Sequence, residues 1–184
     1  MIRRIQSSDW PSIARIQAES YPHEVLESLE SLQSHWHVSE ATCLVAEVRG
    51  AVVGYILSHP WIRGKVPPLN EIYSNLPANC DSLFIHDLAL SPSFRGMRIG
   101  DGLVEAVFEA GSALGLTHLS LISVQGSTGF WKRFGFKISF PPSVEYVIAV
   151  KRFYPASDFA CMECIPDLEK KLTKLAKLTK FPFL

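Results

Sequence analysis

Leu83-Phe-Ile-His-Asp-Leu-Ala-Leu-Ser-Pro-Ser-Phe-Arg-Gly-Met-Arg-Ile-Gly100 is the stretch that decides the fold of this chain. Its first part, from Leu83 to Leu90, is a near-continuous apolar run, which is typical of a central strand covered on both faces. A turn follows after Pro92, and from about Gly100 to Leu114 apolar residues recur at the spacing of a helix with one buried stripe. The sequence therefore predicts a strand, a short turn and a helix in direct succession.

The turn in this stretch has features of an anion site. At the start of a helix the first backbone N–H groups are free and the helix dipole favours negative charge. Gly96 and Gly100 permit a ligand to approach the backbone closely, and Arg95 and Arg98 could add charge-assisted contacts. The turn therefore predicts a phosphate site, although two glycines near a helix start also occur in purely structural turns.

Upstream, the chain predicts a strand and two helices. Residues 2–5 form a short strand candidate, and Ser8 and Asp9 are candidate caps of a helix that runs to about Ser20. A second helix is expected next, because apolar residues recur there at helical spacing. Its apolar face would consist of Val25, Leu29, Leu32 and Trp36.

A hairpin and a long connection follow. Thr42–Val48 and Val52–Ser58 are β-rich runs separated by Arg49-Gly50, where glycine supplies the positive φ of a tight turn, so an antiparallel hairpin is expected. The connection from Pro60 to Asp81 carries repeated Pro, Asn and Gly with scattered aromatic residues. A connection of this length either gates a substrate cleft or is a variable surface loop, and the sequence leaves both interpretations open.

Downstream, the pattern predicts a strand at His118–Val124, a short helix at Ser127–Phe134 ended by Gly135, and a terminal strand around Val144–Val150. Residues 167–184 carry an apolar stripe and several lysines, which predicts an amphipathic helix. Such a helix could meet a membrane surface or a partner groove. The narrow stripe and modest charge favour docking on its own domain or on a second subunit, as in a homodimer.

Composition excludes several classes of protein. The chain is 47% hydrophobic and 20% charged with a formal net charge of zero, so no long-range field draws it to nucleic acid or to an anionic membrane. Its longest uncharged apolar stretch, Gly50 to Ile62, is too short to span a bilayer. The N-terminal residues lack the apolar core of a secretory signal. We therefore expect a cytoplasmic protein with no integral membrane segment and no nucleic-acid partner.

Metal binding is not expected from the spacing of cysteines and histidines. Cys161 and Cys164 form one pair, but no second pair or histidine cluster with ligand spacing accompanies it. Cys43 and Cys80 are isolated, and all of these thiols are expected to be reduced.

The stretch from His86 to Gly100 resembles the cofactor motif of the GNAT acetyltransferase superfamily, which is Arg or Gln, two residues, Gly, one residue, and Gly or Ala. Phe130-Trp-Lys-Arg-Phe-Gly-Phe136 resembles the short helix and strand start that close that fold. The resemblance implies an α/β (α+β) fold with a central mixed, largely antiparallel sheet flanked by helices. It divides the chain into a domain of residues 1–153 and a C-terminal extension of residues 154–184 with the amphipathic helix.

The resemblance also implies how acetyl-CoA would bind, as a co-substrate. The strand backbone at Leu88, Ala89 and Leu90 would meet the acyl and pantetheine parts. The turn and helix start would bind the pyrophosphate, through Arg95, Gly96, Met97, Arg98, Ile99, Gly100 and Asp101. Gln125 and Ser127, at the end of the next strand, stand where the superfamily often meets the pantetheine. One departure is that the internal glycine of the motif is Arg98 here, and a side chain at that point could impede the cofactor.

Acyl transfer to an amine requires an uncharged amine, so a base must act beside the thioester. His86 and Asp87 are the polar residues of the apolar strand, and alternation would put them on opposite faces. Ile85–Leu90 with Ser93–Arg95 is similar to the arylalkylamine N-acetyltransferase branch, in which a histidine at the position of His86 belongs to the proton relay. That branch has a second histidine where this chain has Phe84. The resemblance implies that His86 is the base, and a buried histidine with a satisfied hydrogen bond is the alternative. Asp87 would orient a neighbour or bind the substrate ammonium.

Trp131 stands where the superfamily usually has a tyrosine that acts as the acid. An indole N–H is a donor without useful acidity, so Trp131 is expected to pack on the pantetheine arm, on an aromatic acceptor or in the core. The thiolate would then leave unassisted or take a proton from Tyr146 or another group.

The activity implied is transfer of an acetyl group from acetyl-CoA to a primary amine, with a small-molecule acceptor, by direct attack in a ternary complex. A protein N-terminus or lysine is an alternative acceptor and would require an open groove. A non-catalytic acyl-CoA sensor is a further alternative, because Arg98 and Trp131 depart from two familiar positions.

Overall fold

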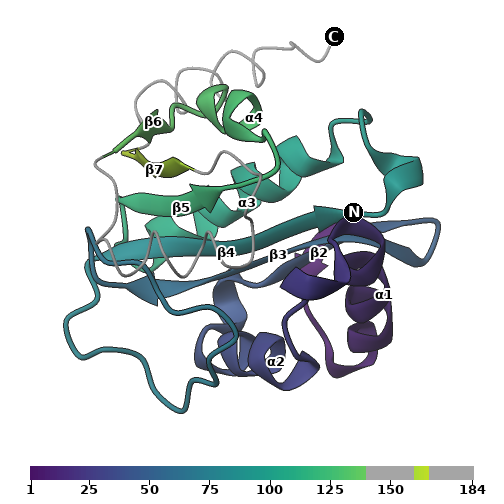
Figure 1. Ribbon diagram of the computed structural model, residues 1–184, viewed down its shortest axis with the longest axis horizontal. Helices are drawn as coiled ribbons and strands as arrows, with labels where there is room; N and C mark the ends of the chain where they lie inside the picture. The colour runs from purple at the N-terminus through teal and green to yellow at the C-terminus, as the bar shows by residue number, and fades with distance from the viewer. Residues whose placement is uncertain (140–159, 166–184) are drawn as a thin grey trace, which may run out of the picture.

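The computed structural model describes residues 1–139 and 160–165 of the chain, and these form a sheet flanked by helices (Figure 1). The described strands make a seven-stranded sheet in the order β1-β2-β3-β4-β5-β7-β6. Only the β4–β5 pair among them is parallel. The prediction of a mixed, largely antiparallel sheet is confirmed. The strands are β1 (Ile2–Arg4), β2 (Leu44–Val48), β3 (Ala51–Trp61), β4 (Ser82–Leu90), β5 (Leu119–Ser123), β6 (Lys137–Ile138) and β7 (Ala160–Cys164).

Helices cover both faces of the sheet, and each face has its own apolar core. The helices α1 (Trp10–Ser20) and α2 (Leu29–Val38) pack against side chains of β2 and β3 such as Val45 and Tyr55. On the other face α3 (Ile99–Ala113) packs against the alternate side chains, such as Ala46 and Ile56. The fourth helix, α4 (Thr128–Lys132), follows β5. Short 3-10 turns are η1 (Ser7–Asp9), η2 (His23–Val25), η3 (Glu40–Thr42) and η4 (Pro92–Phe94).

The second helix is shorter than its apolar spacing predicts. It begins at Leu29 because Ser28 acts as the N-cap, its side-chain oxygen accepting a hydrogen bond from the Ser31 N–H at 3.1 Å. Val25 therefore lies outside the helix, in η2, and Leu29 is 43% exposed. Leu32 and Trp36 are buried as predicted.

The sheet continues past the predicted domain boundary at residue 153. Strand β7 inserts between β5 and β6, and it pairs antiparallel with both. Its Cys161, Met162 and Cys164 side chains are buried, so burial explains why these residues are apolar or small. The predicted strand around Val144–Val150 and the helix in residues 167–184 lie outside the described residues.

Strands β4 and β5 pair for only part of their length. Their parallel register joins Leu83 to Leu119 and ends with Ile85 and Leu121, whereas β4 continues to Leu90. From residue 86 onward the edge of β4 that faces β5 has no partner strand among the described residues. Backbone N–H and C=O groups at such an edge need other partners, so this opening is where an extended ligand can bind.

Close packing of β3 against β4 predicts the effect of one substitution. A Cβ atom on Gly54 would overlap the Leu90 Cδ2 methyl and lie 3.1 Å from the Ala89 carbonyl oxygen. We expect Gly54→Ala to lower the free energy of unfolding by about 1–3 kcal/mol, the usual cost of overpacking. Gly129→Ala is the matched control, because a Cβ there meets no atom within 4 Å. Urea denaturation of both variants measures the difference, and equal stability would contradict the packing described.

Candidate active site

A β-bulge in β4 places His86 and Asp87 on the same face of the sheet. In the register of β3 with β4, Leu57 pairs with Asp87 and Ser58 with Ile85, so His86 is an extra residue. A bulge of this kind interrupts the alternation of side chains. Ile85 packs in the core under α3, but both polar side chains reach the face that α1 and α2 cover, where the His86 ring centroid lies 4.0 Å from that of His35. The prediction of opposite faces is therefore wrong.

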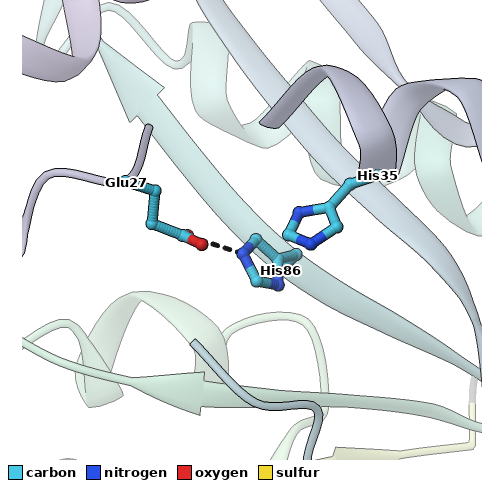
Figure 2. A group of neighbouring side chains, drawn as sticks. All are labelled: Glu27, His35 and His86. Atoms are coloured by element: carbon cyan, nitrogen blue, oxygen red, sulfur yellow. Dashed lines mark hydrogen bonds and ion pairs between the residues drawn. The ribbon is translucent and has the colours of Figure 1, made fainter. Parts of the chain in front are cut away.

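His86 forms an ion pair with Glu27, which precedes α2 (Figure 2). The distance from His86 Nε2 to Glu27 Oε1 is 2.6 Å. Burial alone would lower the pKa of His86, but the charge and hydrogen bond of Glu27 outweigh it and raise the pKa. Burial would raise the pKa of Glu27, yet His86 lowers it to about 2. The pairing therefore stabilises the imidazolium form of His86 and the carboxylate form of Glu27.

The Glu27 carboxylate is also the more accessible member of the pair. Its side chain is 13% exposed, whereas that of His86 is 2% exposed. Its second oxygen, Oε2, accepts hydrogen bonds from the Asn70 N–H at 2.8 Å and from the Ser31 hydroxyl at 3.2 Å. Asn70 belongs to the connection between β3 and β4, so that connection helps to position the carboxylate.

Asp87 is held between two tyrosines. Its Oδ1 accepts a hydrogen bond from the Tyr21 hydroxyl and its Oδ2 one from the Tyr55 hydroxyl, each at 2.5 Å. Burial raises the pKa of Asp87, although both tyrosine hydrogen bonds act in the opposite direction. Of the two roles left open by the sequence, this arrangement favours orienting a neighbour, because each carboxylate oxygen already has a donor.

A cavity of about 610 Å³ runs along the open edge of β4. At one end it is lined by Glu27 and His86 together with apolar side chains such as Val25 and Leu69. At the other end it reaches the start of α3. The predicted cofactor-site residues that line it are Leu88, Ala89, Leu90, Arg95, Gly96, Arg98, Gly100, Asp101, Gln125, Ser127 and Trp131.

Two predicted cofactor-site residues do not line this cavity. Met97 is 63% exposed, and with Ile99 it borders a shallow hollow beside Ile2 and Val48. The reason is the backbone turn before α3, where Gly96 has a φ of 78° and Arg98 a φ of 60°. Met97 lies between these two left-handed residues and Ile99 follows them, and neither side chain lines the cavity.

Arg98 takes the left-handed conformation that glycine adopts most easily, without filling the cavity. Its side chain is 82% exposed and turns outward to Asp101, with Nε 3.1 Å from Oδ2. Arg133 holds the same carboxylate at 2.9 Å. Burial acts to raise the pKa of Asp101, but the two arginines lower it. Arg95, Arg98 and Arg133 thus surround the helix start with positive charge, which suits a phosphate.

Aromatic side chains and a tight turn form the wall opposite β4. Trp131 is 6% exposed, and its ring packs edge-on against Phe130 and Phe136 at centroid distances of 4.9 and 5.5 Å. Gln125 lies in the tight turn that follows β5 and has a φ of 53°. Trp131 therefore both packs in the core and presents an edge to the cavity.

Glu27 is the site residue that sequence reasoning missed. It lies 59 residues from His86 in the chain. An acidic residue beside an N-cap such as Ser28 is a common helix signal, so no local pattern distinguished it. Its role depends on contacts between distant parts of the chain.

Comparison with solved structures shows the same fold in several proteins, one of them in complex with isobutyryl-CoA and one with CoA. The GphF GNAT-like decarboxylase in complex with isobutyryl-CoA is 15% identical, with a TM-score of 0.69 over 90% of this chain and 98% of that one. Ard1 from Thermoplasma volcanium is 18% identical, with a TM-score of 0.65 over 90% and 97%. Rv2747 from Mycobacterium tuberculosis, in complex with CoA and NLQ, is 22% identical, with a TM-score of 0.61 over 90% and 98%.

The fold and the cavity beside a cationic helix start define the class of GNAT-fold proteins. The family model of the acetyltransferase (GNAT) family matches residues 10–136, and the chain belongs to this family. A search of curated proteins finds no match. In the part of the chain that the structure describes, no helix combines the length and the apolar character needed to cross a membrane.

Proposed function

We propose that this protein transfers an acetyl group from acetyl-CoA to the primary amine of a small molecule. The observation that carries the proposal is the single cavity that joins the arginine-rich start of α3 to the Glu27–His86 pair. Phosphates would bind at the helix start, and the pantetheine would lie along the open edge of β4 at Leu88, Ala89 and Leu90. The thioester would then lie beside the pair.

The Glu27–His86 pair is the proposed proton acceptor. The amine must lose a proton before its nitrogen can attack the carbonyl carbon of the thioester. The pair accepts that proton when its imidazole is neutral, and the more accessible Glu27 carboxylate is its contact with the cavity. A C–N bond forms, the C–S bond breaks, and the electron pair leaves on sulfur. The nitrogen then releases its second proton to water, which gives the neutral amide. Trp131 supplies no acidic proton, so in this proposal the thiolate leaves without a proton from that position.

The proposal of a small-molecule acceptor is supported by the residues that line the cavity beside Glu27. Val25 and Leu26 after α1 line this end, and Leu69 and Asn70 reach it from the β3–β4 connection. Hydrogen bonds from the Asn70 N–H to Glu27 and from the Ser28 N–H to the Asn70 side chain hold that connection in place. A protein N-terminus or lysine would need an open groove. The apolar lining suits an amine with an aromatic or aliphatic body, as in the arylalkylamine branch.

Two assays test this function. Calorimetry with acetyl-CoA is expected to give one binding site per chain, and free-thiol release is expected with small arylalkyl or aliphatic amines. Peptides with a free N-terminus or lysine serve as the comparison acceptors. Turnover with peptides alone would contradict the small-molecule acceptor, and binding without turnover for any amine would identify a sensor instead.

A further inference from the structure

Three potential metal ligands meet beside the cavity, from segments far apart in the sequence. Glu27, His35 of α2 and His86 of β4 each offer one ligand atom, and these atoms all lie within 4.8 Å of one another. Figure 2 shows the His35 and His86 rings side by side, with the Glu27 carboxylate directed at His86. We infer that these three side chains bind a divalent transition-metal ion of the zinc class, for which two imidazoles and a carboxylate are a suitable ligand set.

His35 supplies an independent observation in favour of a ligand. The residue is 0% exposed, and among the described residues neither of its ring nitrogens makes a hydrogen bond within the usual distance and angle limits. The Glu71 backbone makes only a weaker polar contact with the ring, which acts to raise the pKa of His35 against the larger lowering by burial. A buried polar group without a partner costs about 1–3 kcal/mol, so proteins rarely retain one without a use. A metal bound to His35 would satisfy one of these nitrogens.

The distances require little movement to accept an ion. Two ligands about 2.1 Å from a tetrahedral zinc ion lie about 3.4 Å apart. Here Glu27 Oε1 and His86 Nε2 are closer than that, at 2.6 Å, because a proton bridges them. All three ligand atoms lie within 4.8 Å, so shifts of about 1 Å would form the coordination sphere.

The surroundings of Glu27 are those of an oriented metal ligand. Its Oε2 accepts hydrogen bonds from the Asn70 N–H and the Ser31 hydroxyl, which leaves Oε1 directed at the ion. Glu27 and His86 both line the cavity, whereas His35 does not. A fourth coordination position would therefore face the cavity and hold water or a ligand, as at zinc sites with three protein ligands.

Binding of the ion also has a consequence for the activity. A metal on His86 and Glu27 occupies the lone pairs that accept the proton, so zinc is expected to inhibit acetyl transfer in competition with the amine. This expected inhibition rests on the proposed function, whereas the inferred binding of the metal ion is independent of it.

Metal titration of the full chain tests the inference directly. Chelator-treated protein is titrated with Zn²⁺ by calorimetry and with Co²⁺ by visible absorption, in the absence of acetyl-CoA. We expect one ion per chain and the intense visible bands of a four-coordinate Co²⁺ site. His35→Phe keeps an aromatic ring and Glu27→Gln keeps the shape of the side chain. Each removes one ligand and is expected to weaken Zn²⁺ binding at least about 100-fold.

His37→Gln is the matched control, because His37 is exposed on the same helix. It is expected to bind Zn²⁺ like the wild type. Absence of Zn²⁺ binding to the wild type would overturn the inference, and so would wild-type affinity in Glu27→Gln or in a folded His35→Phe. Thermal unfolding shows whether each variant is folded. If His35→Phe does not fold, the Zn²⁺ affinity of Glu27→Gln alone tests the inference. Because the assay needs neither acetyl-CoA nor amine, its outcome is independent of the proposed activity.

Discussion

His86→Ala is expected to lower kcat/KM for acetyl transfer by about 10²- to 10⁴-fold, the range that a positioned acid–base group contributes. The reason is that the substitution removes the imidazole that shares a proton with Glu27 at 2.6 Å. The start of α3, where the phosphates of acetyl-CoA are proposed to bind, is at the other end of the cavity from this pair. The dissociation constant of acetyl-CoA should therefore change by less than about threefold. Steady-state kinetics and calorimetry measure the two quantities separately.

Glu27→Gln provides a second arm of this experiment. If the two residues act as one unit, each single variant and the double variant Glu27→Gln/His86→Ala lose comparable activity, because effects within a catalytic unit are strongly non-additive. His37→Gln, exposed on α2, should retain full activity. A fully active His86→Ala enzyme would remove the pair from the mechanism.

Gly100→Val is expected to weaken acetyl-CoA binding at least about 100-fold, because it closes the phosphate end of the cavity at the first turn of α3. A Cβ atom at Gly100 would lie 3.4 Å from the Phe130 ring and 3.5 Å from a Leu90 methyl. The fold accepts that first carbon as an ordinary contact, but the two further methyl groups must enter the cavity. Calorimetry with acetyl-CoA measures the loss.

Gly129→Val is the control for this prediction. It makes the same change at a glycine that does not line the cavity and whose Cβ would meet no atom within 4 Å. We expect it to bind acetyl-CoA normally. Urea denaturation should show that Gly100→Val remains folded, and unchanged affinity in that variant would locate the phosphate site elsewhere.

Local patterns predicted most of the elements that build the site. The β4–turn–α3 unit follows from an apolar run, two glycines and a helical stripe, each of which acts over a few residues. The hairpin at Arg49-Gly50 was predicted for the same reason, and it forms between β2 and β3. The limits of α2 were missed because the cap at Ser28 outweighs the continuing apolar spacing from Val25.

The chemistry of the site depended on contacts that no local pattern contains. Alternation places His86 and Asp87 on opposite faces, yet the register of β3 against β4 makes His86 a bulge and turns both to one face. Glu27 and His35 then reach His86 from α2 and the residues before it. The sequence showed no metal-ligand spacing, because only packing brings together Glu27, His35 and His86, the residues proposed to bind a metal ion.

By itself, the sequence determined the strand, the glycine-containing turn and the helix from Leu83 to Ala110, because short-range periodicity and glycine conformation require only neighbouring residues. Only the tertiary structure decided that His86 of β4 pairs with Glu27 and packs against His35. Strand register and helix docking set those contacts, and both depend on burial between segments distant in the chain.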